Sequence, residues 1–305
     1  MIAVRDLRKE YGDFAAVEGS TFSVDAGEVF GIIGPNGAGK TTTLKMLAGL
    51  VEPTSGHVEV AGLGAGETEM RRQLGFLPEE SPLYEEMSPR SYLRFFGDLY
   101  DVPRETADER IGDTLDRLEL EHRDRPLGDM SKGMKRKVAI ARSLINDPDV
   151  LVYDEPASGL DPLTTNYIID FTRDLGDQGK TVVFSAHNLF HVESICDRVA
   201  IMNEGAIVAR GDLAELQREY GTTEYHVYTT VEVPEAVQEN GRYRRVVDSM
   251  DAVEETREAA AAAGGEVVDI RTVESSLEEV FLNVAEDGRE TRRRRRQRGD
   301  PEPEA

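Results

Sequence analysis

The feature that most constrains this chain is a glycine-rich motif that directly follows an apolar run. Residues 29–33 read V-F-G-I-I, and the pattern G-x-x-x-x-G-K-[ST] comes next, through Gly34, Pro35, Asn36, Gly37, Ala38, Gly39, Lys40, Thr41 and a further Thr42. Glycines let consecutive backbone N–H groups turn towards phosphate oxygens, and the helix that follows points its positive end at the same anion. Lys40 can reach the β and γ phosphates, and the Thr41 hydroxyl is placed to bind Mg²⁺. We therefore expect a phosphate-binding loop; a glycine turn without a ligand is the alternative.

A second apolar run ends in two adjacent carboxylates. Val150–Tyr153 has the composition of a buried strand, and Asp154 and Glu155 follow it at once. We expect Asp154 to hold Mg²⁺, directly or through water, and Glu155 to polarise the attacking water. Two acids after a strand usually form only a solvated turn, but the upstream phosphate loop favours the catalytic interpretation.

The pattern of apolar runs predicts an α/β fold with a mostly parallel core sheet. Runs at 29–33, 150–153 and 181–185 read as buried strands, whose C-terminal ends form the edge where such sheets bind ligands. Residues 1–30 read as short alternating strands, which predicts an N-terminal antiparallel β subdomain. A helical subdomain is expected at about 82–146, with Ser88 and Pro89 as the N-cap and first residue of one helix.

The nucleotide-binding part is predicted to cover 1–220, and a different pattern follows. Residues 221–287 read as a small α+β appendage, with strands at 226–233 and 266–272, a helix through 259–263 and another at 275–284. Residues 288–305 hold five consecutive Arg at 292–296 and an acidic, proline-containing end, so we expect a disordered tail.

Charge and cysteine content limit the function classes. The chain has 305 residues with 36 Lys+Arg against 59 Asp+Glu, a formal net charge of −23. Such a body does not suit nucleic-acid binding by phosphate neutralisation, and no specific nucleic-acid partner is expected. The acidic, Lys-poor composition resembles that of proteins from salt-loving organisms, with an ordinary acidic cytosolic protein as the alternative. The single cysteine, Cys196, excludes an internal disulfide framework. No apolar run is long enough to span a bilayer, so work at a membrane would need a partner.

Together these motifs resemble the nucleotide-binding subunit of an ABC transporter over about residues 1–215. The Gly34–Thr41 loop matches the family's Walker A motif, and Asp154 and Glu155 match its Walker B aspartate and catalytic glutamate. Further matches are Tyr11 for the aromatic residue that stacks on adenine, Asp161 in the D-loop Ser158-Gly159-Leu160-Asp161, His187 for the switch histidine, and Met130–Met134 for the signature motif.

Two motifs depart from the usual family pattern. The signature, usually L-S-G-G-Q, keeps only Ser131 and Gly133, a form that looks like the variant of type 2 exporter ATPases. These two residues still provide the hydroxyl and the backbone N–H for a γ-phosphate contact. In the Q-loop, Glu79 replaces the usual Gln, so its role as a Mg²⁺ ligand competes with a role in coupling to the permease.

The resemblance implies an ATPase that uses ATP and Mg²⁺ and powers a membrane exporter. Two subunits, identical or paralogous, would meet head to tail and enclose each ATP between the Lys40 loop of one and the Ser131–Gly133 helix of the other. Glu155 would activate water and His187 would stabilise the γ-phosphate. The permease would be a separate integral-membrane chain, which places this subunit in the cytoplasm at the inner face of the cell membrane. The alternative is a non-transport ABC ATPase that acts on nucleic acid or ribosomes.

Overall fold

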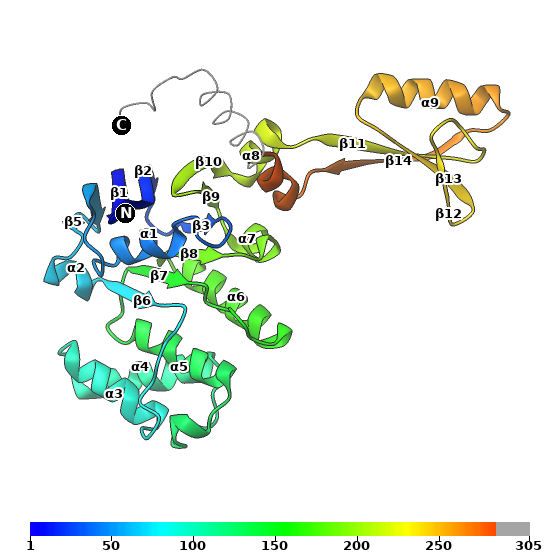
Figure 1. The fold of residues 1–305 in the computed structure, drawn as a ribbon. Coiled ribbons are helices and arrows are strands. Elements are labelled where there is room, and N and C mark those ends of the chain that lie inside the picture. Colours follow the sequence, from blue (N-terminus) through cyan, green and yellow to red (C-terminus); the bar gives the residue numbers. More distant parts are fainter. Residues whose placement is uncertain (285–305) are drawn as a thin grey trace. The chain divides into compact units, whose positions relative to one another are not determined.

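A computed structural model describes residues 1–284 of the chain. These residues form two compact units, Met1–Asp212 and a second that begins at Leu213 (Figure 1). The predicted domain boundary at residue 220 falls at the end of α8 (Leu213–Tyr220), the first helix of the second unit. The expected tail at 288–305 lies outside the described residues.

The centre of the first unit is a six-stranded sheet. Its strand order is β10-β9-β3-β8-β7-β6, in which the neighbours from β9 to β6 run parallel and β10 runs antiparallel to β9. The strands are β3 (Val29–Ile33), β6 (Leu74–Leu77), β7 (Val150–Asp154), β8 (Thr181–Ala186), β9 (Arg198–Asn203) and β10 (Ala206–Asp212). Every residue of β3, β7 and β8 is buried, which is why these strands read as nearly continuous apolar runs. The prediction of a mostly parallel core sheet is confirmed.

Helices cover both faces of this sheet. Alternate residues of a strand point to opposite faces, so the fully buried strands need packing partners on each side. Phe30 and Ile32 belong to a core cluster that includes Leu44 of α1 (Lys40–Leu47). On the other face, Gly31 closely approaches Val192 of α7 (Leu189–Ile195), and α6 (Pro162–Asp177) packs beside α7. The sheet is therefore buried on both sides.

A second sheet of the first unit is antiparallel, as expected for the N-terminal residues. Its order is β2-β1-β4-β5, and it is followed in the chain by a short helix, α2 (Thr68–Arg72). The strands are β1 (Ile2–Tyr11), β2 (Phe14–Val24), β4 (Ser55–Val60) and β5 (Leu63–Gly64). Its inner face joins the core cluster over α1, so both sheets share one hydrophobic core.

The helical part consists of α3 (Pro89–Leu99), α4 (Arg104–Arg117), a 3₁₀ turn at Leu127–Asp129 and α5 (Lys132–Leu144). The predicted start of α3 is confirmed: Ser88 is the N-cap, its hydroxyl accepts a hydrogen bond from the Ser91 backbone N–H, and Pro89 is the first helical residue. In α5, Ser131 is the N-cap and accepts from the Met134 N–H at 3.2 Å.

The second unit is a four-stranded antiparallel sheet covered by a helix. After α8 come β11 (Thr223–Thr229), β12 (Val237–Glu239), β13 (Arg242–Val247), α9 (Met250–Ala262) and β14 (Val267–Glu274), in sheet order β12-β13-β11-β14. Residues 277–284 are helical. Val227, Val247 and Val253 of α9 form the core between sheet and helix.

The β12–β13 hairpin was not predicted from the sequence. β12 is exposed throughout and β13 carries three Arg, so neither shows the apolar alternation of a half-buried strand. The turn signal was Asn240-Gly241, where both residues have positive φ, 48° and 80°. The strand expected at 226–233 also ends earlier, at Thr229.

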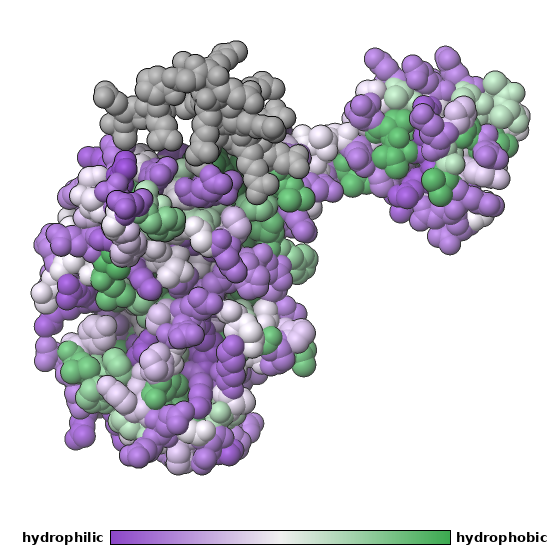
Figure 2. All heavy atoms as spheres, viewed as in Figure 1, coloured by the Kyte–Doolittle hydropathy of each residue, from purple (hydrophilic) through white to green (hydrophobic). Residues whose placement is uncertain are grey.

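The visible face of the first unit is mostly hydrophilic, with apolar side chains scattered over it (Figure 2). Among residues 1–284, no helix combines the length and the apolar character needed to cross a membrane.

Candidate functional site

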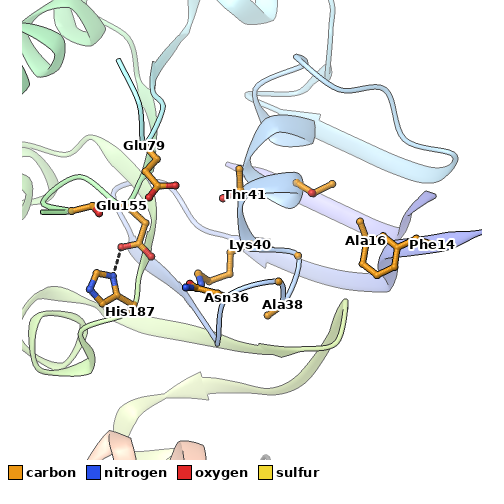
Figure 3. Close-up of a pocket in the computed structure, with 13 residues that line it drawn as sticks. Phe14, Ala16, Asn36, Ala38, Lys40, Thr41, Glu79, Glu155 and His187 are labelled. Carbon is orange, nitrogen blue, oxygen red and sulfur yellow. Dashed lines mark hydrogen bonds and ion pairs between the residues drawn. The ribbon is translucent and has the colours of Figure 1, made fainter. Parts of the chain in front are cut away.

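A cavity of about 550 Å³ opens where β3 leads into α1, a size within the ~300–1,000 Å³ range of small-molecule sites. Figure 3 shows that its walls come from segments far apart in the sequence. The lining residues are Phe14, Ala16, Asn36, Gly37, Ala38, Gly39, Lys40, Thr41, Thr42, Glu79, Glu155, Ser158 and His187. The predicted phosphate loop and Glu155 thus meet around one space, although more than a hundred residues separate them in the chain.

The loop between β3 and α1 has a backbone shape that requires glycine. Gly37 and Gly39 have φ of 82° and 98°, a region that side chains with a Cβ rarely adopt. A Cβ on Gly39 would also collide with the Ala16 carbonyl oxygen, and one on Gly34 with that of Met202. The loop therefore lies tightly against β2 and β9. The first N–H groups of a helix have no acceptor within the helix, and Lys40, Thr41 and Thr42 of the first turn of α1 line the cavity.

Lys40 occupies the floor of the cavity and is buried. Its ammonium group donates to the carbonyl oxygens of Gly34 at 2.8 Å and Pro35 at 3.3 Å. Burial lowers the pKa of Lys40, whereas the negative charges of Glu155, Asp154 and Glu79 act to raise it. A lysine surrounded by carboxylates suits a phosphate chain that is bound together with a metal cation, since the cation offsets the negative charge of the carboxylates.

Asp154 is a buried carboxylate at the end of β7, held from two sides. Its Oδ1 accepts from the Thr41 hydroxyl at 3.2 Å and from the Ser185 hydroxyl of β8 at 2.6 Å. Thr41 and Asp154, the two residues that the sequence predicts as Mg²⁺ ligands, therefore place two oxygen atoms side by side at the start of α1. Such a pair fits Mg²⁺, which takes few protein ligands and completes its shell with phosphate and water oxygens.

Glu155 and His187 form a pair at the cavity wall. His187 Nδ1 lies 2.7 Å from Glu155 Oε2, and the carboxylate is largely buried whereas the imidazole is exposed (Figure 3). Glu155 has φ of 46°, which is strained for a residue with a side chain. Its backbone N–H donates to Ser185 Oγ at 3.0 Å, so β8 helps to hold this conformation. The pair directs a carboxylate at the space where a phosphate chain would end.

The remaining predicted residues fall into two groups, inside and outside the cavity. Glu79, Asn36, Ala38 and Thr42 line it, and Glu79 points at the same space as Glu155 (Figure 3). Ser131 and Gly133 lie at the start of α5 and are not among its lining residues.

Two further predicted residues, Tyr11 and Asp161, lie outside the cavity. Tyr11 does not line the cavity; Phe14, its register partner in the β1–β2 hairpin, does, while the Tyr11 ring lies 5.2 Å from the Lys9 ammonium. Asp161 does not line it either, because its carboxylate caps α6 and accepts from the Thr164 N–H at 3.0 Å and the Thr164 hydroxyl at 2.6 Å. These hydrogen bonds lower the pKa of the Asp161 carboxyl.

Sequence reasoning missed three residues that shape the site: Phe14, Ser185 and Arg136. Ser185 is a polar residue inside an otherwise apolar strand run, and it contacts both Asp154 and Glu155. Arg136 is buried on α5 together with Ala139 and Ile140. Residues three and four positions apart lie on the same face of a helix, so the spacing of Arg136 from Ala139 and Ile140 could have indicated that it is buried.

A glycine loop on a helix, an oxygen pair at the next strand end and a carboxylate facing the same space are the working parts of a P-loop nucleoside triphosphatase. The comparisons with known proteins narrow this class. A family model described as "ABC transporter" matches residues 17–158.

Relatives cover most of the chain. Nod factor export ATP-binding protein I of Burkholderia lata is 37% identical over 231 residues, which are 74% of this chain and 76% of the relative. Linearmycin resistance ATP-binding protein LnrL of Bacillus subtilis is 35% identical over 219 residues, which are 71% of this chain and 70% of the relative. The chain therefore belongs to the ATP-binding proteins of the ABC transporter family, and it is an ATPase of that family.

Solved structures agree with this assignment. The ATP-binding subunit of an ABC transporter superposes with a TM-score of 0.67 at 33% identity, covering 72% of this chain and 93% of the other. An ATP-binding cassette in a dimeric post-hydrolysis state, bound to ADP and Pi, has a TM-score of 0.64 at 25% identity and covers 70% and 99%. The expected ABC ATPase fold is confirmed.

Proposed function

We propose that this chain is the ATP-hydrolysing subunit of a membrane exporter and works as a head-to-tail dimer. The proposal depends on one observation: the predicted site residues lie in two separate places on the subunit. Lys40, Thr41, Asp154 and Glu155 meet at one cavity, whereas Ser131 and Gly133 lie outside it at the start of α5. An N-terminal helix end with a serine cap suits a phosphate that a second subunit presents.

The chemistry within one subunit follows from the charges around the cavity. The N–H groups of the Gly34–Gly39 loop and the Lys40 ammonium bind the phosphate chain of ATP. Thr41 and Asp154, with Glu79 beside them, would hold Mg²⁺, which supplies charge neutralisation for the transferred phosphoryl group. Their oxygen-only donor set fits this ion, which usually keeps few protein ligands, so its remaining ligands would be phosphate oxygens of ATP and water.

Hydrolysis needs a base that faces the terminal phosphate. Glu155 is placed to accept a proton from the attacking water, and the 2.7 Å contact with His187 orients its carboxylate. His187 is exposed enough to turn towards the γ-phosphate when a partner subunit covers the cavity. The strained backbone of Glu155 supports this role, because such strain persists where the surrounding contacts position a reacting group.

The names of the relatives support the direction of transport. Nod factor export and linearmycin resistance both describe movement of a compound out of the cell or protection from it. We infer that the partner is an integral-membrane permease on a separate chain, because the relatives are named as the ATP-binding proteins of export and resistance systems. The subunit would then act at the cytoplasmic face of the cell membrane, paired with a second copy or a paralogue.

The test combines a Glu155→Gln variant with a change at the start of α5. Glu155→Gln should bind ATP, lose ~10²–10⁴-fold in turnover and accumulate as an ATP-dependent dimer, since the closed state no longer resolves by hydrolysis. Adding Ser131→Arg should abolish the dimer and leave ATP binding by each subunit unchanged, as Ser131 is outside the cavity.

The control is Asp113→Arg, which also introduces an arginine, with a charge change of two units against one for Ser131→Arg, at an exposed position of α4. It should leave dimerisation intact when molar mass is measured by light scattering with and without ATP. Wild-type turnover in Glu155→Gln would refute the assignment of the base. A dimer that survives Ser131→Arg would refute the head-to-tail arrangement.

A further inference from the structure

Arg136 is a buried guanidinium at the meeting point of three segments. Only 8% of its surface is exposed, and all five N–H donors have acceptors within reach. Among the described residues its hydrogen-bond partners are uncharged oxygens: the carbonyls of Pro156 (2.7 Å), Pro78 (2.7 Å), Glu79 (3.0 Å), Glu155 (2.8 Å) and Asp154 (3.0 Å), and the hydroxyl of Ser81 (3.4 Å).

These acceptors belong to two loops that leave neighbouring strands. The parallel ladder between β6 and β7 ends at the pair Leu77 and Tyr153. Beyond that pair, the carbonyl oxygens of residues 78–79 and 154–156 turn to Arg136. The side chain therefore continues the connection between the two segments past the end of the ladder, and each segment carries a carboxylate of the cavity, Glu79 or Glu155.

Arg136 also fixes the strained residue of the site. Glu155 has φ of 46°; Ser185 accepts from its N–H and Arg136 donates to its carbonyl oxygen. Both hydrogen-bonding groups of the Glu155 backbone are thereby held by buried side chains. Burial lowers the pKa of Arg136 to about 10, with the charge of Asp154 acting to raise it, so the side chain remains a cation at neutral pH.

We propose that Arg136 is a positioning residue that sets the backbone of the general base Glu155 and couples it to the Glu79 segment. Because Arg136 lies on α5, whose first turn carries Ser131 and Gly133, it also links the partner-facing helix end to the base of its own subunit. A shift of α5 on dimer closure is thus transmitted to Glu155 through one side chain. This inference rests on the proposed function.

The test compares Arg136→Gln and Arg136→Lys with Arg142→Gln. Arg142 lies on the same helix, but its guanidinium donates to the Tyr92 hydroxyl at 3.1 Å and stacks on Phe96, away from both loops. Lys offers three donors on a flexible stem against the five of the guanidinium fork, so Arg136→Lys should be only partly active.

The expected result separates chemistry from binding. In Arg136→Gln, kcat should fall ~10–100-fold while the Kd for ATP changes less than ~3-fold, because the Lys40 loop makes none of these contacts. Hydrogen exchange should speed up in 78–81 and 154–158 together. Arg142→Gln should keep its kcat and the exchange rates of both loops, whatever its loss of thermal stability.

The proposal is overturned if Arg136→Gln turns over ATP like the wild type, or if kcat and Kd deteriorate together. If Arg136→Gln does not fold, Arg136→Lys decides by the same measurements. Hydrogen exchange in the two loops can be measured without ATP turnover. A wild type that does not hydrolyse ATP would therefore refute the proposed function, while the exchange rates would still test whether Arg136 holds the two loops.

Discussion

The hydroxyl of Ser185 joins Asp154, the proposed metal ligand, to Glu155, the proposed general base, and its removal has a calculable consequence. Ser185 is fully buried in β8; its Oγ donates to Asp154 Oδ1 at 2.6 Å and accepts from the Glu155 N–H at 3.0 Å. Ser185→Ala deletes both hydrogen bonds and changes the side-chain volume little.

Each lost hydrogen bond has an expected cost. A hydrogen bond to a carboxylate contributes about 1.5–3 kcal/mol, and a buried N–H left without an acceptor costs about 1–3 kcal/mol. Asp154 keeps its contact with Thr41, so the losses are not fully additive, and we expect about 2–4 kcal/mol in the free energy of unfolding. The fold should survive that loss, but kcat should fall ~10-fold or more, because the strained Glu155 backbone loses one of its two anchors.

Ser143→Ala is the matched control. Ser143 is also buried, and its hydroxyl bonds to the Ile140 carbonyl at 2.7 Å and the Tyr153 hydroxyl at 2.9 Å. These partners are uncharged, so about 1–2 kcal/mol should be lost and kcat should stay within ~2-fold of the wild type. Stability is best followed by hydrogen exchange at β7 and β8 amides, since the two units need not unfold together.

The reasoning fails if Ser185→Ala and Ser143→Ala lower kcat equally. Such a result would mean that turnover follows the stability of the first unit and not the geometry of Glu155. It also fails if Ser185→Ala loses stability but retains the wild-type kcat. The hydroxyl would then contribute to the stability of the fold and not to turnover.

Two further predictions concern the base of the nucleotide and the surface charge. Phe14→Ala should weaken ATP binding ~5–150-fold, the equivalent of the ~1–3 kcal/mol of an aromatic–base stack. Tyr11→Ala should weaken it less, because Phe14 lines the cavity and Tyr11 does not. Equilibrium dialysis with ATP measures both, and the reverse order would favour Tyr11 as the stacking residue. With a net charge of −23, the thermal midpoint should rise between ~0.1 M and ~1 M KCl as the screening length falls from ~10 Å to ~3 Å; a midpoint that stays constant or falls in a calorimetric scan would contradict the salt-adapted interpretation.

Much of the architecture could be predicted because it depends on local pattern. β3, β7 and β8 are buried on both faces, so their apolar runs were visible in the sequence. The start of α3 was visible in Ser88-Pro89, since a cap is a local hydrogen bond. The β12–β13 hairpin escaped because it is exposed and Arg-rich, and only its Asn240-Gly241 turn carried a signal.

The sequence by itself determined the phosphate loop, the strand that ends in Asp154-Glu155 and the family resemblance, because each depends on residues adjacent in the chain. Only the tertiary structure decided which distant groups meet. It placed Phe14 at the wall of the cavity, placed the Asp161 carboxylate at the N-cap of α6, and joined Arg136 to segments 58 and 18 positions away. Such contacts depend on how strands and helices pack in three dimensions, and no spacing along the chain encodes a hydrogen bond between a side chain and a remote backbone carbonyl.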